Sequence, residues 1–101
     1  MKTLLACLAL LLLPAAAQSP FRVEVTLAPG LSAAPLNGRM DLFLSTDPAR
    51  EPRFQISDQV DTQQMFGLNV ARFAAGSAAT FDGRVLGYPA PNLESLPAGD
   101  Y

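Results

Sequence analysis

The sequence FRVEVTL at residues 21–27 alternates apolar and polar side chains without a break. A repeat with a period of two predicts a β-strand with one buried face and one face in water. The face expected to be buried holds Phe21, Val23, Val25 and Leu27, and the opposite face holds Arg22, Glu24 and Thr26. The sequence APG at residues 28–30 ends this strand, because Pro removes a ladder donor and Gly permits a turn.

Working outward, strand-like alternation recurs along the chain, at residues 39–46, 65–73 and 78–82. Residues 54–57 are expected to form a short edge strand, and a further short run follows at 83–86. In the second strand Met40, Leu42 and Leu44 would share one face, with Asp41, Phe43 and Ser45 on the other.

The connections between these strands carry turn residues. Asn37-Gly38 predicts a tight turn ahead of the second strand, because both residues tolerate positive φ. Arg72 interrupts the alternation of residues 65–73, which predicts a bulge or a strand end near Ala71. Residues 88–91 read Tyr-Pro-Ala-Pro and predict an extended linker.

Short alternating strands separated by Pro- and Gly-containing turns predict an all-β fold. We expect an antiparallel β-sandwich of the immunoglobulin-like kind over residues 18–101. Such a sandwich has about seven strands in about 100 residues, whereas the patterns here give four or five. The expected domain is therefore an incomplete sandwich, and we expect it to be marginally stable alone, aggregation-prone, or completed by further sequence.

The last residues, LPAGDY at 96–101, have the form of a tyrosine corner. In sandwich domains a tyrosine at such a turn donates its hydroxyl hydrogen back to the backbone of the turn. We expect Tyr101 to do so.

The N-terminal residues have the pattern of a secretory signal peptide. Lys2 precedes an apolar run at residues 4–13, and the sequence AAA at 15–17 offers the small residues that signal peptidase accepts. We place a helical signal peptide at residues 1–17. A membrane anchor is disfavoured because the apolar stretch at 4–17 falls short of the roughly 20 residues that span a bilayer. A lipoprotein signal is disfavoured as well, because a cut before Cys7 would leave the leucine run in the mature chain instead of in the signal.

Removal of residues 1–17 takes away the chain's one cysteine and its one lysine, Cys7 and Lys2. What remains has no His, Cys, Lys or Trp, and its six arginines against nine carboxylates give a net charge near −3. Disulfides, the usual zinc ligands, and nucleophiles activated by His or Lys are thereby excluded from residues 18–101. An acidic chain without a basic cluster is also a poor partner for nucleic acid.

Four groups of residues are candidate sites. The sequence GLSAA at residues 30–34 nearly matches the nucleophile elbow Gly-x-Ser-x-Gly, but Pro35 prevents the helix that must follow, and no His base is present. The loop carboxylates Asp47, Glu51, Asp58 and Asp61 offer oxygen ligands for calcium, although their spacing suits turns equally well. The same carboxylates could serve glycoside hydrolysis, but residues 18–101 contain no Trp that could stack on a sugar.

Arg50 and Arg53 flank Glu51. They either bind a carboxylate or cross-link the proline-rich loop to its neighbour, and we favour the second interpretation. Phe43, Phe54, Phe73 and Phe81 form either a core or a face that docks on another domain, and we favour docking. No catalytic, cofactor-binding or metal-binding residue is assigned, and no cofactor is expected.

Four segments carry a resemblance to a known family, namely GRMDLFLS at residues 38–45, EPRFQ at 51–55, TQQMFG at 62–67 and LPAGDY at 96–101. They resemble the N-terminal region of large exported bacterial esterase-like proteins. In that family a β-rich N-terminal region precedes a longer part with an α/β-hydrolase-type catalytic unit. The resemblance implies that the nucleophile, acid and base lie beyond Tyr101, so it assigns no catalytic residue to this chain.

The sequence therefore favours a non-catalytic N-terminal β-sandwich segment of an exported esterase-like hydrolase, in the periplasm or secreted. Its expected partner is a C-terminal catalytic domain or a partner subunit that covers the unfinished sheet. No nucleic acid and no stable membrane span after signal cleavage are expected. The alternative is a free-standing periplasmic or secreted binding module.

Overall fold

The computed structural model describes residues 21–101. The signal peptide predicted at residues 1–17 lies outside the described residues. Within residues 21–101 the elements are β1 (Val23–Thr26), β2 (Leu36–Leu44), η1 (Pro52–Gln55), β3 (Gln64–Phe73), β4 (Ala78–Phe81), β5 (Gly87–Tyr88) and η2 (Leu93–Ser95), where η marks a short 3-10 helix.

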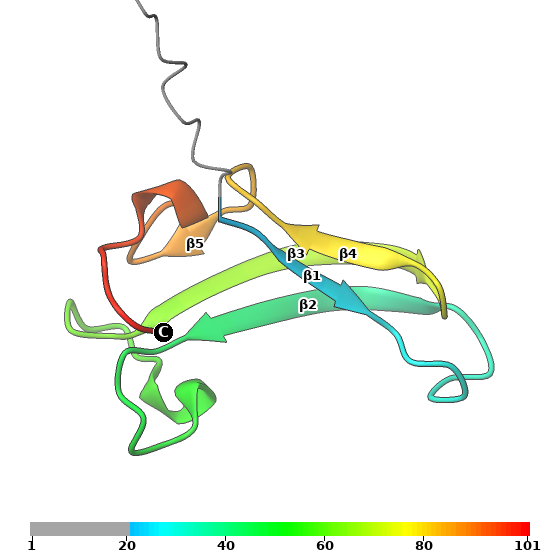
Figure 1. Cartoon of the computed structure of the whole chain (residues 1–101), viewed down its shortest axis with the longest axis horizontal. Coiled ribbons are helices and arrows are strands. Elements are labelled where there is room, and N and C mark those ends of the chain that lie inside the picture. Colours follow the sequence, from blue (N-terminus) through cyan, green and yellow to red (C-terminus); the bar gives the residue numbers. More distant parts are fainter. Residues whose placement is uncertain (1–20) are drawn as a thin grey trace, which may run out of the picture.

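The strands form two antiparallel sheets (Figure 1). One sheet pairs β1 with β4, and the other has the order β2-β3-β5. In the larger sheet Met40 lies opposite Leu68, and Phe66 lies opposite Gly87 of β5. The prediction of an all-β, antiparallel fold is confirmed.

A single apolar core joins the two sheets. The buried residues Phe66, Phe81, Ala90 and Leu93 form its centre. Val23 and Val25 pack against it from β1, as do Met40, Leu42 and Leu44 from β2. The predicted faces of these two strands are confirmed, with one exception. Phe21, expected to be buried, is 52% exposed, because it precedes β1 and has no partner residue in β4.

The predicted bulge lies in β3 opposite the start of β2. Leu36 pairs with Phe73 and Gly38 with Val70, so Ala71 and Arg72 together face Asn37. Arg72 has a φ of 53°, and its N–H donates to Oδ1 of Asn37 at 2.8 Å. The tight turn predicted at Asn37-Gly38 is therefore wrong: both residues belong to β2, and the Asn side chain serves the bulge.

Two other segments differ from their predictions. Residues 54–57 do not form an edge strand, because the chain turns through η1, which begins at Pro52. Residues 88–91 do not form an extended linker. Tyr88 pairs with Met65 in β5, and the N–H of Gly87 donates to the carbonyl of Pro91 at 3.1 Å, which closes a tight loop.

Candidate functional site

Ser32, the serine of the elbow-like sequence at residues 30–34, lies in the loop between β1 and β2. Its hydroxyl donates to the carbonyl of Ala34 at 2.6 Å, and Gly30 has a φ of 85°. The segment is a turn held by a local hydrogen bond. Its geometry lacks the strand-to-helix transition that exposes a nucleophile in hydrolases.

The four loop carboxylates are spread over separate local contacts. Oδ1 of Asp47 accepts from the N–H of Ala49 at 2.9 Å, and Glu51 pairs with Arg53 at 2.7 Å. Oδ1 of Asp58 accepts from the Gln59 amide at 2.8 Å. Among residues 21–101, no three His, Cys, Asp or Glu side chains lie close enough together to hold a metal ion.

Arg53 pairs with Glu51 inside its own loop, so it does not link this loop to a neighbouring segment. Its guanidinium also lies 4.6 Å from the centre of the Phe54 ring, a cation–π contact at an exposed site. Sequence reasoning missed Gln55, which organises the loop. Its amide donates to the carbonyls of Asp47 and Arg50, and its Oε1 accepts from the Ser45 hydroxyl at 2.7 Å.

The four phenylalanines do not share a surface. Phe73 and Phe81 are buried, so the docking interpretation is wrong for them. Phe43 is half-buried on β2, and Phe54 is 61% exposed. Alternation alone does not reveal which aromatic residues the second sheet covers.

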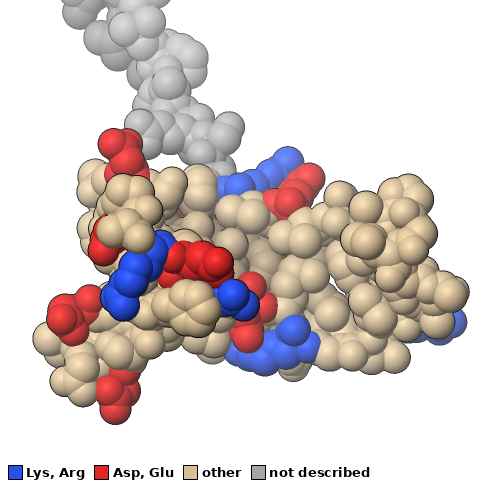
Figure 2. Space-filling model, turned by 90° about the horizontal axis from the view of Figure 1, so that it is seen from below, with Lys and Arg blue, Asp and Glu red and all other residues tan. Residues whose placement is uncertain are grey.

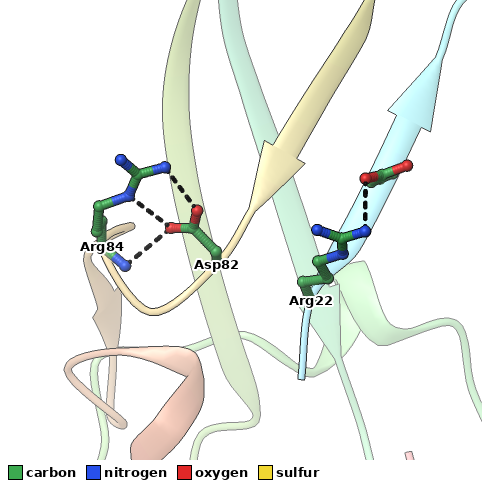
Figure 3. Close-up of polar contacts among 4 residues, drawn as sticks. Arg22, Asp82 and Arg84 are labelled. Carbon is green, nitrogen blue, oxygen red and sulfur yellow. Dashed lines mark hydrogen bonds and ion pairs between the residues drawn. The ribbon is translucent and has the colours of Figure 1, made fainter. Parts of the chain in front are cut away.

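A charged depression lies at the turn after β4 and is lined by Arg22, Asp82, Gly83, Arg84 and Glu94. Figure 3 shows the Arg84 side chain folded back on Asp82, while Arg22 contacts a carboxylate on its own strand. Asp82 accepts from Nη2 of Arg84 at 2.8 Å and from the Arg84 backbone N–H at 2.9 Å. These hydrogen bonds, the side-chain one foremost, hold the pKa of Asp82 below its ordinary value of 3.8.

The cations of this depression are therefore already paired. The hydrogen bond to Asp82 likewise raises the pKa of Arg84, and Nη2 of Arg22 lies 3.3 Å from Glu24. The arrangement is that of a turn stabilised by an Asp side chain, so we do not assign it an anionic ligand.

The tyrosine corner forms as predicted at the end of the chain. The Tyr101 hydroxyl donates to the carbonyl of Pro97 at 2.9 Å. Asp100 and Tyr101 line one hollow together with Ser45 and Thr46, which follow β2. Figure 1 shows the C-terminus beside this end of β2.

Large apolar side chains remain on the surface of the described residues. They are Phe21, Leu31, Leu36, Phe54, Val60, Leu86, Tyr88 and Tyr101. Leu31 is 74% exposed and Val60 is 93% exposed. Figure 2 shows that one end of the face seen from below is almost free of charge, whereas the other end carries both signs.

No family model, curated protein or solved structure matches the chain. Across residues 21–101, the helical segments are too short and too polar to cross a bilayer.

Proposed function

We propose that this chain is the non-catalytic N-terminal segment of an exported bacterial esterase-like hydrolase, folded as an incomplete immunoglobulin-like β-sandwich. Its role is to pack against a catalytic domain, or against a partner subunit, that covers its exposed apolar side chains. Fold alone does not define a function, so the packing role rests on the exposed apolar surface, and the association with a hydrolase rests on the four segments that resemble that family.

The supporting observation is the balance between buried and exposed apolar residues. Within residues 21–101 six apolar residues are buried, while eight large apolar side chains are exposed. Isolated exposed apolar residues are ordinary in proteins. Here eight large ones are exposed beside a small buried core, which agrees with a module whose surface is covered by something else.

The sandwich part of the proposal is supported by two features. The two sheets share one core, formed from Val23 and Val25 on one side and Met40 and Leu42 on the other. The hydrogen bond between Tyr101 and Pro97 is the corner interaction found in sandwich domains.

The coding sequence after the codon for Tyr101 tests the association with a hydrolase. An open frame that goes on to encode Gly-x-Ser-x-Gly and a later His is the expected result. The purified chain should not hydrolyse p-nitrophenyl acetate, because residues 18–101 contain no His, Cys or Lys base. A stop codon together with a soluble, cooperatively folding monomer would instead identify a free-standing binding module.

Export is tested at the other end of the chain. We expect signal peptidase to cut after Ala17, so the intact mass of the exported protein, measured by mass spectrometry, should correspond to a chain that begins at Gln18. Ala17→Arg should block processing, because the enzyme's pocket accepts only small side chains. A product that retains residues 1–17 in the cytoplasm would refute the proposed localisation.

A further inference from the structure

We propose that β2 pairs edge to edge with β2 of a second copy of this chain, in an antiparallel register centred on Met40. The proposal concerns the free edge of the larger sheet and does not depend on the association with a hydrolase.

The first argument is that β2 has an open edge. It pairs with β3 on one side and is the outermost strand of its sheet. Within residues 21–101 no other segment makes a backbone hydrogen bond to residues 36–44. In Figure 1 β2 borders the sheet, and no strand lies along its outer side. The outward-facing N–H and C=O groups of this nine-residue strand form a template for another strand.

The second argument is that this edge lacks the usual protection. Natural edge strands are blunted by unpaired charged side chains, above all Lys, by Pro, by charges that point inward, or by a bulge that twists the edge away. The two charged residues of β2, Arg39 and Asp41, pair with each other. β2 contains neither Lys nor Pro, and its inward positions are the apolar Met40, Leu42 and Leu44. The bulge in this sheet lies in β3, opposite Asn37.

The third argument is charge complementarity with a second copy. Arg39 and Asp41 lie on the same face of β2, with Nε of Arg39 3.3 Å from Oδ1 of Asp41. An antiparallel pair centred on Met40 places Arg39 of each copy opposite Asp41 of the other. In the single chain both side chains lie over Gly67 of β3, and Arg39 also donates to Asn69. In the dimer these contacts within one chain are exchanged for two opposite-charge pairs across the interface, which stabilise an antiparallel pairing. An arbitrary peptide does not offer this reciprocal pattern.

The same register also fits on the inner face. Gly38 lies opposite Leu42 of the second copy, and a Cβ built on Gly38 meets no atom within 4 Å, so the leucine has room. Leu36, which is 44% exposed, lies opposite Leu44 of the second copy. The pairing thus covers an apolar side chain that the single chain leaves in water.

The test uses the protein purified after export through its own N-terminal segment, followed by sedimentation equilibrium over a range of concentrations. The wild-type chain is expected to dimerise. Arg39→Asp and Asp41→Arg each place like charges opposite one another twice, and each should weaken the homodimer by about tenfold or more. Circular dichroism checks that both variants remain folded.

Mixing the two variants gives the decisive measurement. The variant with two carboxylates faces the variant with two guanidiniums, so an equimolar mixture should form a heterodimer. The double variant R39D/D41R should recover the homodimer. Mixing cannot restore the pair within one chain, so recovery by mixing reports a contact between copies.

The matched control is Arg22→Asp, which disrupts the similar pair Arg22–Glu24 on the other sheet and should leave dimerisation unchanged. A wild-type chain that stays monomeric at all concentrations would overturn the proposal. So would charge-reversed variants that dimerise as tightly as the wild type, or an edge occupied by a co-purified protein of different sequence.

Discussion

The Phe66 ring of β3 lies against the bare backbone of β5 at Gly87. Phe66 is fully buried, and a Cβ placed on Gly87 would overlap its ring and approach the carbonyl oxygen of Met65. At this position glycine is needed because two pieces of chain approach closely.

Phe66→Ala should therefore lower the free energy of unfolding by about 3–5 kcal/mol, the usual cost of removing a buried aromatic ring. The midpoint of urea unfolding measures the change. Phe54→Ala is the control, since Phe54 is 61% exposed and its loss should change stability by about 0.5 kcal/mol or less.

Gly87→Ala should cost about 1–3 kcal/mol, because the added methyl group overpacks the core against ring and backbone. Gly99→Ala is the matched control, since a Cβ there meets only ordinary contacts, 3.5 Å from Cγ2 of Thr46 and farther from Tyr101. Equal midpoints of urea unfolding for the two variants would show that a methyl group fits at position 87 without overpacking the core.

Asp82 makes stability depend on pH in a definite direction. Its pKa is lowered in the folded chain from 3.8, so its contribution is present above that value and is lost as the pH falls through the folded pKa. Asp82→Asn keeps an oxygen acceptor for the Arg84 N–H but removes the ion pair. Urea unfolding between pH 5 and pH 2 should show a shallower loss of stability in the variant than in the wild type.

At the scale of single elements, the bulge in β3 holds one residue in an unusual conformation. Arg72 has a φ of 53°, a region that costs L-residues roughly 1–2 kcal/mol. Arg72→Gly should relieve this cost and raise the unfolding midpoint, whereas Arg72→Val should lower it because branched side chains resist positive φ. If both variants unfold at the wild-type midpoint, the left-handed conformation is not a source of strain.

The strands show how far sequence reasoning reaches. Alternation located β1 and the inward residues of β2, because one buried face imposes a period of two. The break at Arg72 located the bulge for the same reason. The turn predicted at Asn37-Gly38 was wrong because the turn preference of these two residues is local, whereas their place in β2 is set by pairing with the distant strand β3. β5 was missed because two residues are too few to carry a period.

The candidate site was less accessible to sequence reasoning than the fold. The corner at Tyr101 was predictable because its motif and its hydrogen bond lie within a few residues. The loop organised by Gln55 was not predictable, because a single glutamine belongs to no recognisable motif and its hydrogen-bond partners are brought to it only by the folded loop. Whether Phe73 and Phe81 are buried likewise depends on which sheet covers them, and alternation does not show this.

At the scale of the whole molecule, both sheets contribute to one core, so we expect them to unfold together. Far-UV circular dichroism and tyrosine fluorescence should give coincident urea transitions, the signature of two-state unfolding. Two separated transitions would show that the β1–β4 sheet detaches before the larger one.

The tyrosine corner also fixes where any fused partner would start. Because Tyr101 and Thr46 line the same hollow, a reporter attached after Tyr101 begins at the end of the molecule that carries the β2–β3 connection. The β1–β2 loop, to which Leu31 belongs, lies toward the opposite end (Figure 1). A donor dye at position 31 and an acceptor after position 101 would therefore sit at opposite ends of the folded domain. A change in energy transfer between the two dyes would report a change in the distance between the two ends of the domain.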